Sequence, residues 1–229
     1  MDLFLMLLRW LHFLFGITWI GLLYYFNLVQ VPFFAETEAG VRSGAIQKLV
    51  PRALWWFRWG AMGTVIVGVL YLIIYWAQTG WSFNSWAVAI LTGGTLGLVM
   101  WYNVWFVIWP NQKIIIANAV ATAAGGQANP AAAPAGRRAG LASRTNVMFS
   151  IPMLFFMGAA SHYPYFNAVS SAGILLWIIL AGAVIAALEA NALVGTQGPT
   201  KQPLDSIPGV VTTGFVVWFV LLVIIKITV

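Results

Sequence analysis

The chain has 229 residues, of which 62% are hydrophobic and only 7% are charged. Because a soluble domain has about 25% charged residues, this composition excludes an ordinary soluble fold. The formal net charge of +6 comes from sparse basic residues beside apolar runs, which indicates the positive loops of a membrane protein rather than a nucleic-acid partner. The chain contains no cysteine, so disulfides, thiolate metal sites and covalently attached haem are excluded within it.

Six apolar stretches reach the length of about 20 residues that a membrane span requires. They cover residues 3–34, 54–77, 86–109, 146–165, 169–191 and 207–228. The first begins without a basic region or a cleavage site, so we interpret it as a span and not as a signal peptide. The sequence therefore predicts an all-α integral membrane protein, a six-transmembrane-helix bundle that forms a single membrane domain over residues 1–229.

The connections between spans differ in composition. The first, "AETEAGVRSGAIQKLVPRALWW", is expected to hold a short interfacial helix. The segment "NQKIIIANAVATAA" is expected to prolong the third helix beyond the membrane. Residues 118–143 are rich in Ala, Gly and Pro, which predicts a flexible cytoplasmic linker.

Basic residues are distributed asymmetrically among these connections. The first, third and fifth connections hold eight Lys and Arg residues: Arg42, Lys48, Arg52, Lys113, Arg137, Arg138, Arg144 and Lys201. The second and fourth hold none. The positive-inside rule then places the odd-numbered connections in the cytoplasm and both termini outside.

His12 and His162 are the only histidines, and the predicted topology puts both in the outer half of the bundle. An imidazole in this position can bind haem iron, bind copper, relay protons or hydrogen-bond a neighbour. A haem b ligated by two histidines needs facing helices and no thiolate, which this sequence allows. The alternative is that each histidine is a hydrogen-bonded packing residue.

Arg9 precedes His12 by three residues and shares its helical face. Its guanidinium could pair with a haem propionate or with an anionic substrate. The alternative is that it reaches the outer headgroups. Met153 and Met157 with His162 would suit Cu(I), but methionine is also an ordinary core residue, so copper is less favoured than haem.

Two stretches carry more specific patterns. The first span contains R-x-x-H followed by "TWIGLLYYF", and the fourth contains "PMLFFM" followed by "SHYP". With "WWFRWGAMGT" and "WYNVWFVIWPNQK", they resemble the membrane region of the bacterial membrane-bound urate hydroxylase family, also described as cytochrome-c-type urate oxidase. The first pattern is similar, more loosely, to membrane protoporphyrinogen oxidase and copper-resistance membrane proteins.

The resemblance implies a bacterial inner-membrane oxidoreductase that hydroxylates urate toward 5-hydroxyisourate and passes electrons to a c-type cytochrome. His12 and His162 match the motif histidines, and Arg9 matches the arginine before the first. The hypothesis is that the two histidines ligate haem b, Arg9 neutralises a propionate and Trp19 packs near the ring.

The family's C-terminal cytochrome c domain, with its C-x-x-C-H motif, has no counterpart in this sequence. The electron acceptor is therefore expected to be a separate c-type cytochrome. The alternative function is that of a non-catalytic accessory subunit in a larger respiratory or oxygenase membrane complex, whose histidines would only hydrogen-bond.

Overall fold

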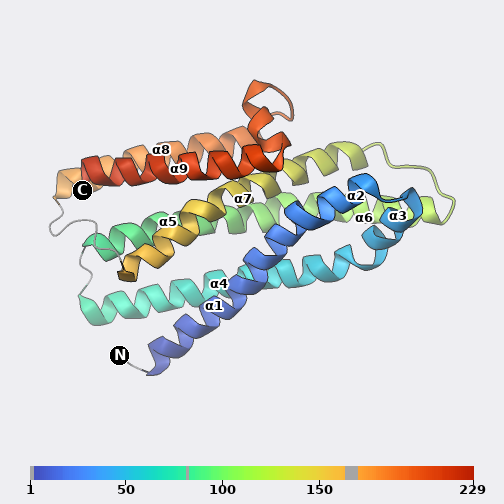
Figure 1. Cartoon of the computed structure of the whole chain (residues 1–229). Helices are drawn as coiled ribbons and strands as arrows, with labels where there is room; N and C mark the ends of the chain where they lie inside the picture. The colour runs from blue at the N-terminus through green and yellow to red at the C-terminus, as the bar shows by residue number, and fades with distance from the viewer. Residues whose placement is uncertain (1–2, 81–82, 163–169) are drawn as a thin grey trace. The chain divides into compact units, whose positions relative to one another are not determined.

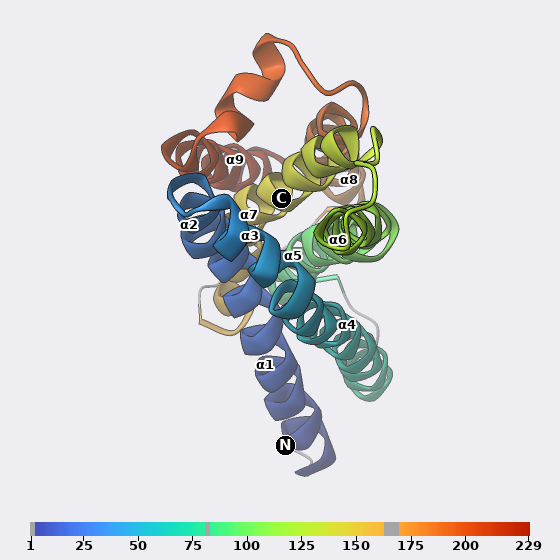
Figure 2. The ribbon, with the colours of Figure 1, turned by 90° about the vertical axis from the view of Figure 1, so that its right-hand side faces the viewer.

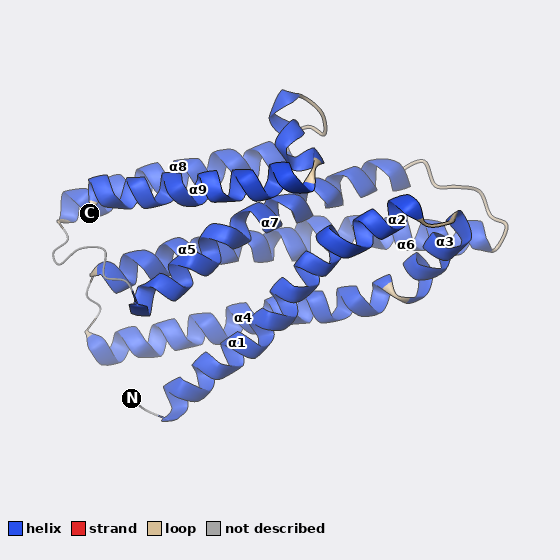
Figure 3. Ribbon diagram, in the orientation of Figure 1, coloured by secondary structure: helices blue, strands red, loops and turns tan. Residues whose placement is uncertain are grey.

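A computed structural model of the chain describes residues 3–80, 83–162 and 170–229. Throughout these residues the regular structure is helical, with no strand (Figures 1 and 3), which confirms the predicted all-α class. In chain order the elements are α1 (Leu3–Tyr24), the π-helix η1 (Tyr25–Gln30), α2 (Val31–Glu36), α3 (Ala39–Lys48), α4 (Val50–Thr79), α5 (Ser85–Tyr102), the π-helix η2 (Asn103–Ile108), α6 (Trp109–Ala123), α7 (Ala132–His162), α8 (Ser171–Leu193), the 3-10 helix η3 (Pro199–Asp205) and α9 (Ile207–Thr228).

Five stretches of the described chain are long and apolar enough to cross a membrane. They are Leu3–Glu36, Val50–Thr79, Ser85–Ala123, Ser171–Leu193 and Ile207–Thr228. These stretches contain the first, second, third and sixth predicted spans, and the fifth from Ser171 onward. Of the two remaining residues of the fifth predicted span, Ser170 is the N-cap of α8 and residue 169 lies outside the described residues. The fourth predicted span, 146–165, begins in the second half of α7, and its last three residues are also outside the described part. A multi-pass membrane protein is supported, whereas the six-span count and the orientation of the termini stay predictions.

The connections are more helical than the sequence suggests. Helix α3 provides the short helix expected in the first connection, and α6 prolongs the third span as far as Ala123. Only residues 124–131 separate α6 from α7, so both helices extend into the predicted 118–143 linker. Alanine is the best helix former, and Pro134 lies in the first turn of α7, where its missing N–H is tolerated.

The chain forms two compact units. Unit 1 comprises residues 1–71 and 101–144, and unit 2 comprises residues 72–100 and 145–229. Helix α1 therefore belongs to unit 1 together with most of α4, and the second half of α7 belongs to unit 2 together with α8 and α9.

Both π-helices belong to unit 1 and stand just before a proline, Pro32 or Pro110. Proline lacks an N–H and clashes with the carbonyl four residues earlier, which disturbs the regular α-helical ladder. A π turn is one way to accommodate such a disturbance. Each π-helix also contains a buried asparagine, and Asn27 donates from Nδ2 to the hydroxyl of Ser143 in α7 at 2.8 Å. This bond ties the irregular turn to a neighbouring helix.

In unit 2, glycines allow α7 to approach its neighbours closely. A Cβ on Gly214 of α9 would lie 3.0 Å from the Met148 carbonyl oxygen of α7. That carbonyl is four residues before Pro152, so the proline cannot satisfy it with a helical N–H. Phe155 of α7 packs edge-on against Trp218 of α9, with ring centroids 5.2 Å apart.

Candidate functional site

Arg9, His12 and Trp19 lie on one face of α1, because steps of three and seven residues return to the same side of a helix. This face packs against α4 within unit 1, where the two helices are antiparallel neighbours (Figures 1 and 2). Trp19 lies at the level of Gly60, and Arg9 reaches Tyr71. The structure thus brings three of the four predicted site residues to a single helix interface.

Small residues of α4 make this interface close. Gly60, Thr64 and Gly68 recur every four residues and so share one face of α4. A Cβ on Gly60 would lie 3.2 Å from the backbone nitrogen of Trp19, and a Cβ on Gly68 would lie 2.8 Å from Cε1 of His12. The His12 ring therefore rests on the backbone of α4, in the manner of close helix packing in membranes.

The hydrogen bond of His12 defines which ring nitrogen remains open. Nδ1 of His12 lies 2.9 Å from the carbonyl oxygen of Thr64. Because a carbonyl only accepts, the neutral imidazole carries its proton on Nδ1 and a lone pair on Nε2. No residue in the described part of the chain hydrogen-bonds to Nε2. Metal-binding histidines use this arrangement, in which a carbonyl holds one nitrogen and the other faces the metal.

Arg9 is held on α4 one turn from His12. Its guanidinium donates to the Tyr71 hydroxyl, and its Cζ lies 5.1 Å from the centroid of the same ring. A guanidinium has five N–H donors, and no carboxylate in the described residues pairs with Arg9. The arginine therefore retains donors for an anionic group beside the histidine.

Trp19 is 2% exposed and lies two helical turns from His12. Its indole nitrogen is buried, and among the described residues it has no hydrogen-bond partner. A buried N–H without an acceptor is costly. Trp101, Trp105, Trp177 and Trp218 have the same buried indole N–H without a partner in the described part of the chain, so this feature is not specific to Trp19.

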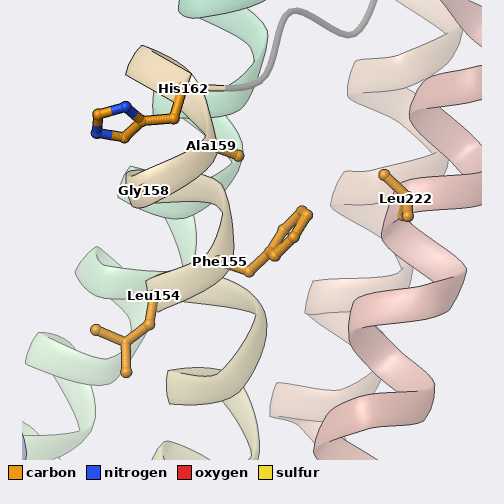
Figure 4. Close-up of a pocket in the computed structure, with 6 residues that line it drawn as sticks. All are labelled: Leu154, Phe155, Gly158, Ala159, His162 and Leu222. Atoms are coloured by element: carbon orange, nitrogen blue, oxygen red, sulfur yellow. The ribbon is translucent and has the colours of Figure 1, made fainter.

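His162 is the last residue of α7 and belongs to unit 2. The residue is exposed and borders an open groove of about 510 Å³. The other lining residues are Leu154, Phe155, Gly158, Ala159 and Leu222. Figure 4 shows Phe155 directed toward Leu222, whereas the imidazole ring projects from the other side of α7. Tyr163 and Pro164 of the "SHYP" motif lie outside the described residues, and the pairing of His12 with His162 stays a prediction.

The two methionines considered for copper have a packing role in unit 2. Gly93 of α5 faces them, and a Cβ there would lie 3.1 Å from Cγ of Met157 and 3.3 Å from the carbonyl oxygen of Met153. Met153 is also buried. Within the described residues, no group of three or more His, Cys, Asp or Glu side chains could hold a metal ion. These contacts favour the core role of both methionines.

Sequence reasoning missed Thr64 and Tyr71, the two residues of α4 that bind His12 and Arg9. The small residues of "GAMGTVIVG" indicate a helix-packing surface but do not identify its partner. The sequence feature that could have located them is the four-residue spacing of Gly60, Thr64 and Gly68, which places these residues on one face of α4. Tyr71 follows three residues later on the same face.

The fold and the interface between α1 and α4 define the class of this protein. It is a multi-pass helical membrane protein with ionisable side chains held between two helices. The model of the family described as urate oxidase N-terminal matches residues 76–221. The chain therefore belongs to the urate oxidase N-terminal family. The matched segment contains His162, whereas α1 with Arg9, His12 and Trp19 precedes it. No curated protein and no solved structure matches the chain.

Proposed function

We propose that this protein is a membrane oxidoreductase of urate oxidation that holds a haem b through His12 and passes electrons to a separate c-type cytochrome. Membership of the urate oxidase N-terminal family supports the urate chemistry. One observation carries the haem proposal: His12 is tied to the Thr64 carbonyl through Nδ1, which leaves the Nε2 lone pair open.

The residues around His12 would suit a histidine that holds a haem. The Thr64 carbonyl holds the ring orientation and makes the imidazole a better donor to iron. Arg9 presents guanidinium donors on the same face of α1, which suits a propionate carboxylate. Trp19 offers a buried indole N–H and an apolar wall. His162 is proposed as the second ligand. When bound, haem supplies a one-electron carrier.

The overall reaction sets what the electron acceptor must do. Conversion of urate and one water to 5-hydroxyisourate releases two electrons and two protons. Because a one-electron carrier such as haem would pass one electron at a time, each turnover would require two transfers to the cytochrome. Arg9 would also complement the negative charge of urate if the substrate approached this face of α1.

The proposal is tested on the full-length chain, purified in detergent after expression with added haem precursor. We expect a Soret band, iron at one equivalent per chain or less, and loss of the band in His12→Ala. His162→Ala tests the second ligand, because it is expected to change the spectrum as well. The activity is measured as consumption of urate with a soluble c-type cytochrome as electron acceptor. The absorbance of urate and the absorbance of the cytochrome are followed together.

Absence of a Soret band from the wild-type protein would overturn the haem proposal. Stoichiometric co-purification with other membrane subunits would then favour the accessory-subunit alternative. Copper without iron in a metal analysis would favour copper handling instead.

A further inference from the structure

Two cations in unit 1 converge on one indole ring. The guanidinium carbon of Arg58, on α4, lies 3.5 Å from the centroid of the Trp109 ring, and the Lys113 ammonium, on α6, lies 5.7 Å from the same ring. Arg58 also lies 5.4 Å from the ring of Trp105. We refer to Arg58, Trp105, Trp109 and Lys113 as the Arg58–Lys113 cluster. Its distances are those of cation–π contacts.

The cluster has no counter-charge of its own. In the described part of the chain, neither Arg58 nor Lys113 forms an ion pair. Arg58 uses Nε to donate to the Leu54 carbonyl at 3.2 Å, and the terminal guanidinium nitrogens have no hydrogen-bond partner there. Because Nε is used in this way, the two terminal nitrogens remain as donors in the plane of the guanidinium. Such a fork matches the oxygen atoms of a phosphate.

Exposed tryptophans of α4 flank the cluster. Trp55, Trp56 and Trp59 of α4 are 47%, 59% and 46% exposed, and Trp59 packs edge-on against Trp105 at 5.5 Å. Exposed tryptophans collect where acyl chains meet headgroups. Arg58 is eight residues from the start of α4, about 12 Å along the helix at 1.5 Å per residue. This position suits a phosphate at the headgroup level with acyl chains along the indoles.

The charge of the chain is concentrated in the same unit. Nine of the eleven basic residues and three of the five acidic residues belong to unit 1, so its formal charge is +6 and that of unit 2 is zero. Helix α3, which carries Arg42 and Lys48, packs against α6 within this unit. The excess charge favours an anionic partner.

We propose that the Arg58–Lys113 cluster binds the phosphate of an anionic phospholipid. A free phosphate would satisfy the cations but would leave the exposed indoles without an apolar partner, so a lipid fits both features. The site goes beyond the proposed redox function and depends only on α4, η2 and α6.

The test uses the full-length chain in detergent, titrated with phosphatidylglycerol or phosphatidylcholine, with bound lipid counted by native mass spectrometry. We expect phosphatidylglycerol to be retained and phosphatidylcholine to be lost. Arg58→Gln and Lys113→Gln should each weaken retention of phosphatidylglycerol by about tenfold, the effect of one charge-assisted hydrogen bond. Arg52→Gln, which removes an exposed charge from the same helix, is the matched control and should leave retention unchanged.

Lys113 is exposed, so its variant tests the proposal even if Arg58→Gln fails to fold. Three outcomes would overturn the proposal. They are equal retention of both lipids, retention in Lys113→Gln equal to that of the wild type, and displacement of phosphatidylglycerol by millimolar inorganic phosphate, which would indicate a site for a free anion.

Discussion

Nδ1 of His12 donates to the carbonyl oxygen of Thr64 at 2.9 Å, across an interface where glycines replace side chains. The bond joins the only histidine of unit 1 to the backbone of the neighbouring helix. The state of the imidazole therefore depends on how closely α1 approaches α4. Any side chain added at this level of α4 has to displace the ring before it displaces the helix.

Gly68→Ala should move the His12 ring. The added Cβ would lie 2.8 Å from Cε1 and 2.9 Å from Nδ1 of His12, closer than unstrained contacts allow. Overpacking of this kind typically costs about 1–3 kcal/mol, so thermal unfolding in detergent should occur at a lower temperature. Gly94→Ala in α5 is the matched control, because a Cβ there meets nothing within 4 Å. Equal unfolding temperatures for the two variants would contradict the close packing of His12.

The Arg9–Tyr71 pair should show a measurable coupling. Tyr71→Phe removes the hydroxyl that accepts from Arg9 but keeps the ring beneath the guanidinium. A double-mutant cycle with Arg9→Gln should give a coupling free energy of about 0.5–1.5 kcal/mol, measured by unfolding in detergent. Tyr102→Phe is the control in unit 1, since Tyr102 is exposed and stacks on Phe106. If the effects of Arg9→Gln and Tyr71→Phe on the free energy of unfolding are additive, the contact contributes nothing to stability.

The helices and the face shared by Arg9, His12 and Trp19 were predictable, because both follow from apolar length and from the 3.6-residue period. The partner of His12 was not predictable, because the acceptor is a backbone carbonyl and every residue has one. The π-helices at Asn27 and Asn103 were also missed, since hydrophobic patterning does not distinguish a π turn from an α turn. The proline that follows each π-helix was the only available sign.

Ser143→Ala tests the bond that ties η1 to α7. Asn27 is buried, so loss of the Ser143 hydroxyl removes one of the acceptors of its amide. The free energy of unfolding should fall by about 1 kcal/mol or more. This loss is detected as a lower unfolding temperature. Ser43→Ala is matched to it, because Ser43 accepts from Gln47 at 3.0 Å within α3, and Gln47, unlike Asn27, is not buried. A larger effect at Ser43 than at Ser143 would contradict the structural importance of the π turn.

The number of spans decides on which side of the membrane the α8–α9 connection lies, and labelling can measure it. The chain has no cysteine, so a single introduced cysteine is a unique label. The exposed positions Gln78, Gln127 and Gln197 report on three connections. If α7 crosses the membrane, Gln127→Cys and Gln197→Cys lie on the same side, and both should resist an impermeant thiol reagent in intact cells because basic connections stay in the cytoplasm. Gln78→Cys, in the last turn of α4 beside a connection without Lys or Arg, should react. Reaction of Gln197→Cys together with protection of Gln127→Cys would mean that α7 does not cross, and the six-span prediction would be wrong.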